Sequence, residues 1–335
     1  MTRPVLITGA QGFVGRYLAA ALLRDGSNEV VGLGRSPANP ARFTHRVSVN
    51  RTVVPAPVPV EIRPCGNYRY VQLDLTDEAA VHGLIAQTRP SIVFHLAGSL
   101  RDEPFDALLS NNIRVTHNVC KALAEVGGAT RLVFASSGSV YGDLAAGGAP
   151  LCESGATRPI DLYSVTKRAS EDIVRVFGSA AGMTAIIARI FNVAGPGQEE
   201  RHLVGRVASQ IADVLRGTAH SIRVGPLVTS RDFIDVRDVA TALVALAESG
   251  AANSIYNVAS GQEIEVHRIL DHLLKATGDK RPTIEQIEGR RTDFSRQIVD
   301  VGALRAHGWR PAFTLQQSLD DVLRYYLELG RSADG

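Results

Sequence analysis

The chain has 335 residues, and its 36 lysines and arginines against 34 aspartates and glutamates leave a formal net charge of +2 at pH 7. A charge so close to balance gives no field that favours binding to nucleic acid or to a membrane surface. With 45% hydrophobic residues, the chain can bury a substantial core, and no apolar run approaches the roughly 20 residues that cross a bilayer.

Cysteine and histidine spacing gives no sign of a disulfide framework or a metal site. Cys65, Cys120 and Cys152 are odd in number and form no CxxC pair, and the nine histidines show no HxxxH or HExxH spacing. No signal-peptide pattern precedes the first apolar run. We therefore expect a cytoplasmic protein without a bound metal.

Short apolar runs alternate with segments of helical periodicity along the first 190 residues. The predicted strands are 4–8, 29–33, 70–73, 91–96, 131–136 and 184–190, and the predicted helices are 13–24, 78–88, 105–126 and 162–178. Strands that alternate with helices indicate an α/β fold, namely a Rossmann-like doubly wound parallel sheet covered on both faces.

Beyond residue 190 the rhythm loosens. Further helices are predicted at 203–216, 236–248, 266–277 and 315–329, separated by glycine and proline breaks. We predict a dinucleotide-binding domain over 1–188, to which 232–258 returns, and a smaller α/β carboxy-terminal substrate domain from 189–231 and 259–335. Six prolines mark 37–64 as an insertion, strand-like around 53–62.

Gly9, Gly12 and Gly15 form a GxxGxxG spacing between the first strand and the first helix. Gly9 suits a tight turn, Gly12 the close approach of a pyrophosphate, and Gly15 close packing of helix on strand, while the helix amino terminus offers N–H donors. The alternative is a glycine-rich turn without a ligand.

The second strand ends in Arg35 and Ser36, where NAD-binding chains usually carry a carboxylate for the ribose hydroxyls. A guanidinium suits the 2′-phosphate of NADP(H) instead, so this cofactor is favoured and NAD(H) remains the alternative. Arg35 has a second interpretation as a solvated loop residue. Asp74, after the third strand, either faces the adenine edge or caps the helix that follows.

Tyr163 and Lys167 lie four residues apart on one face of a predicted helix. An ammonium near a phenol favours the ionised phenol, which can then exchange the proton that accompanies hydride transfer. Ser136 and Ser137 end the preceding strand, where a hydroxyl can hold a substrate oxygen beside the phenol.

These motifs together resemble the extended short-chain dehydrogenase/reductase family of the NAD-dependent epimerase/dehydratase type. The resemblance rests on the glycine loop, Phe94-His95-Leu96-Ala97-Gly98, Asn112, the run from Phe134 through Ser137 to Gly142, and Tyr163-Ser164-Val165-Thr166-Lys167. It implies that Ser137 binds the substrate oxygen, Tyr163 is the acid/base, Lys167 holds the nicotinamide ribose, and Asn112 supports the lysine through water. The implied cofactor contacts are Gly9, Gln11, Gly12, Phe13, Val14, Gly15, Arg35, Ser36, Asp74, Leu75, Leu96, Ala97, Gly98, Tyr163 and Lys167.

Segments 189–198 and 230–239 resemble the nucleotide-sugar branch, in which the GDP-4-keto-6-deoxy-mannose reductases are most similar. This resemblance implies that Asn192 and Arg231 contact the diphosphate or the nucleoside and that Arg290 is the phosphate-binding arginine, with Ser137 and Ser139 at the sugar. Arginines offset a diphosphate's charge through bidentate contacts. The alternative is that Arg231 and Arg290 are surface residues paired with Asp232 and Asp293.

Two related reactions are disfavoured by the residues that follow Ser137. Similar 4,6-dehydratases carry an acid pair there, whereas this chain has Gly138 and Ser139, which cannot supply the acid and base of water elimination. The 3,5-epimerase/reductases need a cysteine and a histidine as acid and base, and no cysteine stands directly after Ser137. His95 is interpreted as a structural residue.

Three hypotheses follow for the function. The first is NADPH-dependent reduction of a nucleotide-linked 4-keto-6-deoxy-hexose, and the second is an NAD-dependent 4-epimerase with the same serine, tyrosine and lysine. The third is a dinucleotide-binding sensor without catalysis. The resemblance also implies a homodimer that pairs helices 105–126 and 162–178 across a two-fold axis.

Overall fold

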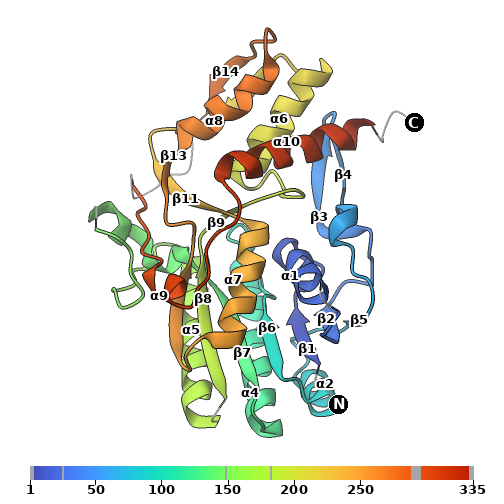
Figure 1. The fold of residues 1–335 in the computed structure, drawn as a ribbon, viewed down its shortest axis with the longest axis vertical. Coiled ribbons are helices and arrows are strands. Elements are labelled where there is room, and N and C mark those ends of the chain that lie inside the picture. Colours follow the sequence, from blue (N-terminus) through green and yellow to red (C-terminus); the bar gives the residue numbers. More distant parts are fainter. Residues whose placement is uncertain (1–3, 25, 148, 182, 288–295, 332–335) are drawn as a thin grey trace.

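A seven-stranded parallel sheet forms the centre of the molecule in a computed structural model that describes residues 4–24, 26–147, 149–181, 183–287 and 296–331. The strand order is β12-β8-β7-β6-β1-β2-β5. The strands are β1 (Val5–Thr8), β2 (Val30–Gly34), β5 (Tyr68–Gln72), β6 (Ile92–His95), β7 (Arg131–Ser137), β8 (Thr184–Ile190) and β12 (Ser254–Val258). The predicted Rossmann-like architecture is confirmed (Figure 1).

Helices cover both faces of this sheet, because alternate strand side chains point to opposite sides. Val5 and Ile7 of β1 join the core beneath one pair of helices, whereas Leu6 joins the core on the other face. The first face carries α1 (Phe13–Leu23) and α7 (Val236–Ser249), and the second carries α2 (Glu78–Thr88), α4 (Val115–Val126) and α5 (Leu162–Ala181) (Figure 1). Strands buried on both faces explain the continuous apolar runs of the sequence.

The helix predicted over 105–126 has three parts. A short α3 (Phe105–Leu108) leads into a π-helical turn, η2 (Leu109–Arg114), and then into α4. The expectation of one regular helix was therefore wrong, since apolar spacing alone does not reveal a π turn. Such turns occur frequently at functional sites, and this one contains Asn112.

The insertion 37–64 folds as an antiparallel hairpin of β3 (Arg42–Val49) and β4 (Thr52–Pro57), followed by the short 3-10 helix η1 (Val60–Ile62). The sequence had indicated strand only around 53–62, so half of the hairpin was missed. Phe43 is buried against Phe13 and stacks on His45, whose Nε2 lies 2.7 Å from the Gly197 carbonyl oxygen. The hairpin thus joins the glycine-loop region to the segment after β8.

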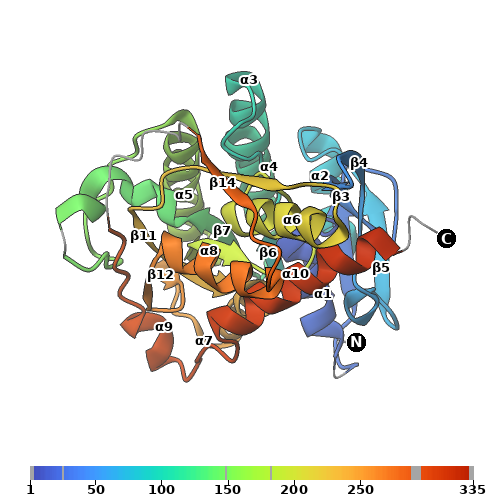
Figure 2. The ribbon, with the colours of Figure 1, turned by 90° about the horizontal axis from the view of Figure 1, so that it is seen from above.

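The remaining elements gather at the end of the sheet where the strands terminate. They comprise β9 (Asn192–Ala194), α6 (Leu203–Arg216), β10 (Ser221–Val224), β11 (Ser230–Asp235), β13 (Glu263–Glu265), α8 (Val266–Leu274), β14 (Thr283–Gln286), α9 (Gly302–Ala306) and α10 (Leu315–Arg331), with 3-10 turns η3 (Gly138–Gly147) and η4 (Lys275–Thr277). In the view from above, α6, α8 and α10 lie over the sheet (Figure 2). The four helices predicted beyond residue 190 are confirmed as α6, α7, α8 and α10. The assignment of α6, α8 and α10 to a separate substrate domain stays a prediction.

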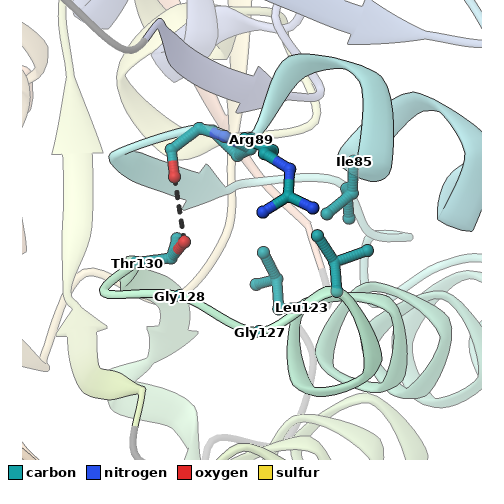
Figure 3. A pocket seen from close by; sticks show the side chains of 8 residues that line it. Ile85, Arg89, Leu123, Gly127, Gly128 and Thr130 are labelled. Atoms are coloured by element: carbon teal, nitrogen blue, oxygen red, sulfur yellow. Dashed lines mark hydrogen bonds between the residues drawn. The ribbon is translucent and has the colours of Figure 1, made fainter.

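A small cavity of about 30 Å³ lies at the opposite end, between α2 and α4 (Figure 3). Arg89 and Pro90 precede β6, and Thr130 precedes β7, where its hydroxyl donates to the Pro90 carbonyl oxygen at 2.9 Å. The cavity is therefore at the amino ends of the strands, away from the glycine loop. Within the described ranges, no helix is both long and apolar enough to cross a membrane.

Candidate active site

The glycine loop joins β1 to α1 in a turn that only glycine fits easily. Gly9 has φ +69°, and a Cβ added at Gly15 would lie 2.3 Å from the Gly9 carbonyl oxygen. Gly12 precedes α1 in an extended conformation and caps it with no side chain, which leaves N–H donors of the first helical turn without a side-chain acceptor. This arrangement fits the pyrophosphate of a dinucleotide. Phe13 and Val14 occupy that first turn.

Gln11 uses its side chain to hold the insertion. Its Nε2 donates to the Pro37 carbonyl oxygen at 2.9 Å, and its Oε1 accepts from the Asn39 amide at 2.7 Å and from Arg16 at 3.0 Å. Because this side chain is buried and occupied, its predicted contact with the cofactor would have to come from the backbone.

Arg35 and Ser36 follow β2, and neighbouring β5 fixes their backbone. Gln72 Nε2 donates to the Arg35 carbonyl oxygen at 3.0 Å, and the Tyr70 hydroxyl donates to that of Ser36 at 2.8 Å. The Arg35 side chain itself is exposed beside the cofactor end of the sheet. A guanidinium in this place is available to an anionic group on the adenine side.

Asp74 does not cap the helix after it, so that alternative was wrong. Its Oδ1 accepts from the Thr76 amide at 2.9 Å and from the Thr76 hydroxyl at 2.8 Å, and Asp77 caps α2 by accepting from Ala80 at 3.0 Å. These hydrogen bonds hold the pKa of Asp74 below its usual range, and the charge of Arg35 adds to them. Leu75, which follows Asp74, is buried.

Leu96, Ala97 and Gly98 follow β6 and adjoin the glycine loop. The Thr8 hydroxyl accepts from the amides of Leu96 and Ala97 at 3.1 Å each. His95 is fully buried, with Nδ1 2.7 Å from the Thr8 hydroxyl and Nε2 3.1 Å from that of Thr116. Burial lowers the pKa of His95 to about 3, and Lys167 acts in the same direction, so this histidine is a neutral structural residue.

Tyr163 lies in the first turn of α5, next to the end of β7. Asp161 precedes the helix, and its Oδ1 accepts from the Ser164 amide at 2.7 Å, which fixes that turn. Burial raises the pKa of the Tyr163 phenol, and its hydrogen bond with Ser137 opposes the effect. The structure thus brings together the predicted serine and tyrosine.

Lys167 extends from α5 towards the end of β7. Its Nζ donates to the Ala135 carbonyl oxygen at 2.7 Å and lies 4.9 Å from the centre of the Phe134 ring. Burial lowers the pKa of Lys167 to about 8, against the charge of Glu171. A Cβ added at Gly98 would be 2.7 Å from Asn112 Oδ1 and 3.6 Å from Lys167 Nζ, so both polar groups converge on this glycine.

Asn112 supports the helix that carries both predicted catalytic residues. Its Nδ2 donates to the Thr166 hydroxyl at 2.9 Å, and its Oδ1 accepts from the Ser99 amide at 2.8 Å. The implied water-mediated link to Lys167 stays a prediction. The direct bond to Thr166 gives Asn112 a positioning role between α5 and the π turn.

Beneath these groups lies a buried ion pair that the sequence motifs did not predict. Arg189 of β8 donates from Nε and Nη2 to the two carboxylate oxygens of Glu171 at 3.0 and 2.8 Å. The Ser136 hydroxyl donates to the same carboxylate at 2.5 Å. One signal was available, because Glu171 follows Lys167 by four residues on the same helical face.

The residues predicted to bind substrate lie on different elements. The buried Ser139 Oγ has no hydrogen-bond partner among the described residues. Asn192 Nδ2 donates to the Asp232 carbonyl oxygen at 2.8 Å and to Gln297 at 2.9 Å, and Arg231 donates to the Ser230 carbonyl oxygen at 2.7 Å. Burial lowers the pKa of Arg231 to about 10, so it stays charged at neutral pH. Arg290 is outside the described residues.

Asp232 is not the partner that the surface-pair alternative assigned to Arg231. Its carboxylate is fully buried and accepts from the amides of Ser260, Gly261 and Gln262 and from the Ser260 hydroxyl. Burial still raises its pKa to about 6 against these bonds. Asp232 therefore holds the turn after β12, and that interpretation of Arg231 was wrong.

The sequence that forms this site matches a known protein family. Residues 5–259 match the model of the NAD dependent epimerase/dehydratase family. The chain belongs to that family. It is an NAD(P)-dependent enzyme of the extended short-chain dehydrogenase/reductase kind, as the sequence motifs predicted.

Members of the NAD dependent epimerase/dehydratase family with several activities are similar to this chain. The GDP-6-deoxy-D-mannose reductase of Pseudomonas aeruginosa is 31% identical over 96% of this chain and 97% of its own. A structure of RMD from Pseudomonas aeruginosa complexed with NADPH superposes with a TM-score of 0.79 at 29% identity, covering 98% and 100% of the two chains. The UDP-glucose 4-epimerase of Thermus thermophilus, in complex with NAD, gives 0.79 at 26% identity over 96% and 98%.

Proposed function

We propose that this enzyme reduces the 4-keto group of a nucleotide-linked 4-keto-6-deoxy-hexose, with NADPH as the reductant. The observation that carries the proposal is the approach of Ser137 to the Tyr163 phenol, together with Gly138 and Ser139 directly after that serine. A hydroxyl pair can hold and protonate a carbonyl oxygen, whereas glycine and serine lack the acid and base of a dehydration. The pair therefore supports ketone reduction.

The chain's own residues account for the proton in this reaction. When bound, the reduced nicotinamide supplies hydride to the carbonyl carbon. Tyr163 transfers its phenolic proton to the carbonyl oxygen, which becomes a hydroxyl, and the phenolate regains a proton from water. Ser137 donates a hydrogen bond to the same oxygen, and the positive charge of Lys167 favours the phenolate.

The polar side chains predicted to bind substrate support an anionic sugar nucleotide. Arg231 would offset the charge of the diphosphate. Asn192 beside it already donates both amide hydrogens within the protein and would offer its amide oxygen to a hydroxyl of the nucleoside. The Ser139 hydroxyl, without a partner among the described residues, would bind a sugar hydroxyl. The relative named GDP-6-deoxy-D-mannose reductase, 31% identical, supports this substrate class.

Arg35 supports NADPH as the cofactor. Its exposed guanidinium follows β2, where a 2′-phosphate could receive a charge-assisted pair of hydrogen bonds. The structural likeness to RMD complexed with NADPH points in the same direction. The glycine loop and the start of α1 would hold the pyrophosphate.

An NAD-dependent 4-epimerase is the second candidate. It is favoured by the electrostatic interaction of Asp74 with Arg35, since a carboxylate partly neutralises the cation that would select NADP. The similarity to an epimerase in complex with NAD supports it as well. Mass spectrometry of the dinucleotide that copurifies separates the two, because an epimerase retains near-stoichiometric NAD.

The test of reduction is direct. The purified protein is supplied with GDP-, dTDP-, UDP- and CDP-linked 4-keto-6-deoxy-hexoses, with NADPH or NADH, and the nicotinamide absorbance is followed. We expect oxidation of NADPH with at least one of them. No absorbance loss with any sugar and either cofactor would reject the proposed function.

A further inference from the structure

The guanidinium of Arg101 lies over the phenol ring of Tyr163. Arg101, in the loop between β6 and α3, has its guanidinium carbon 5.9 Å from the centre of that ring. Its Nε is 2.9 Å from Oδ2 of Asp161, the residue that precedes α5. Two separate contacts therefore bring Arg101 to the helical turn that carries the phenol.

Lys167 is engaged elsewhere in the same structure. Its Nζ donates to the Ala135 carbonyl oxygen, and no hydrogen bond links it to Tyr163 within the part of the chain that the structure describes. The guanidinium of Arg101 is therefore a further cation placed to act on the phenol.

We propose that Arg101 is a positioning residue for proton transfer at Tyr163, placing a second positive charge beside the phenol through its contacts with the ring and with Asp161. The proposal rests on the proposed function only in taking Tyr163 as the proton donor. Arg101 need not touch the substrate to have this effect.

The groups around the phenol determine how large the effect can be. Ser137 approaches from β7 and Arg101 from the β6–α3 loop. Lys167 belongs to α5, and Asp161 directly precedes that helix. Burial raises the pKa of Tyr163, Ser137 and Arg101 lower it, and Asp161 raises it. The Arg101 side chain is 44% exposed, so water screens its charge and a modest effect is expected.

The loop that carries Arg101 also contacts the segment between β9 and α6. Glu103 lies 3.4 Å from Arg201, which in turn lies 3.2 Å from Glu199. Both partners belong to the segment between β9 and α6. The position of Arg101 is thus tied to the part of the molecule predicted to bind the nucleotide sugar.

The test follows Tyr163 itself, without substrate or cofactor. Tyrosine labelled with ¹³C at Cζ is incorporated, Tyr163→Phe assigns the signal, and its pH titration is recorded by NMR. Arg101→Gln should raise the midpoint by about 0.5 pH unit or more, with Arg101→Lys in between. Arg175→Gln, which removes an exposed arginine elsewhere on α5, should leave it unchanged.

The enzyme's pH profile gives a second readout. In the reductive direction, the alkaline limb of kcat/KM should move upward in Arg101→Gln, and kcat should fall while KM changes little. An unchanged Tyr163 midpoint in a folded Arg101→Gln would overturn the proposal, as would a Tyr163 that does not titrate before the wild type unfolds. If no sugar is reduced, the NMR titration still decides the role of Arg101.

Discussion

The Lys167 ammonium donates a hydrogen bond to the Ala135 carbonyl oxygen at 2.7 Å, two residues before Ser137 on the same strand. This bond fixes a buried cation between the helix that carries Tyr163 and the strand that carries Ser137. Burial favours the neutral form of the Lys167 amine, so keeping it charged at the site should lower the free energy of unfolding.

The variant Lys167→Met tests how the loss of unfolding free energy caused by the buried Lys167 charge depends on pH. The pKa of Lys167 is lowered to about 8, whereas in the unfolded chain it is about 10.4. The unfolded chain binds more protons between these values, so the destabilising contribution is complete below pH 8 and disappears as the pH rises to about 10. Relative to Lys167→Met, the wild type should gain on the order of 2 kcal/mol of unfolding free energy across that window. Urea denaturation of both proteins at several pH values measures it, and parallel curves would contradict the prediction.

The Glu171–Arg189 ion pair should respond differently to single and double substitution. Both side chains are buried, so Glu171→Gln leaves an uncompensated guanidinium and should reduce the free energy of unfolding by about 3–5 kcal/mol. The double variant Glu171→Met with Arg189→Met removes both charges and should recover most of that loss. Denaturant midpoints compare the three proteins, and a double variant no more stable than the single one would refute the prediction.

The same substitution at two glycines should have opposite effects. Alanine at Gly15 would place its Cβ 2.3 Å from the Gly9 carbonyl oxygen, so the loop must shift, at a cost of about 1–3 kcal/mol and with weaker dinucleotide binding. Alanine at Gly83, inside α2 with nothing within 4 Å, should stabilise the protein by about 0.5–1 kcal/mol. Thermal unfolding and dinucleotide titration by calorimetry check both signs. Equal effects at the two positions would contradict the assigned loop geometry.

Arg35→Ala tests the preference for NADPH. Losing a charge-assisted contact with the 2′-phosphate should raise the KM for NADPH about tenfold while leaving that for NADH nearly unchanged. Arg69→Ala removes another exposed arginine, on the neighbouring strand β5, and serves as the matched control. A preference that survives Arg35→Ala would assign the 2′-phosphate contact to another residue.

Much of the fold was predictable because its strands are apolar and its helices periodic. The parallel sheet, the glycine loop and the helix that carries Tyr163 form where local sequence patterns predict them. The β3–β4 hairpin was only partly predicted. Arg42, His45 and Arg46 interrupt the apolar pattern of β3, and β4 contains Pro55 and Pro57, although proline is rare inside strands.

Contacts across the site are harder to predict from the sequence. Arg101 and Tyr163 are 62 residues apart in the sequence. Arg189 and Glu171 meet only because α5 packs against the sheet that contains β8. No local spacing encodes such pairs. Motifs identified the reacting groups, whereas the charges around them depend on tertiary structure.

We expect the enzyme to transfer hydride from NADPH to C4 of a nucleotide-linked keto-sugar while Tyr163 supplies the proton. Incubation with a 4-keto-6-deoxy-hexose nucleotide and NADPH deuterated at the transferred position, followed by mass spectrometry and NMR of the product, tests it directly. We expect one deuterium at C4 in the wild-type product, and a rate in Tyr163→Phe that is lower by about 10²–10⁴-fold. Product without deuterium at C4, or an undiminished rate in a folded Tyr163→Phe, would contradict it.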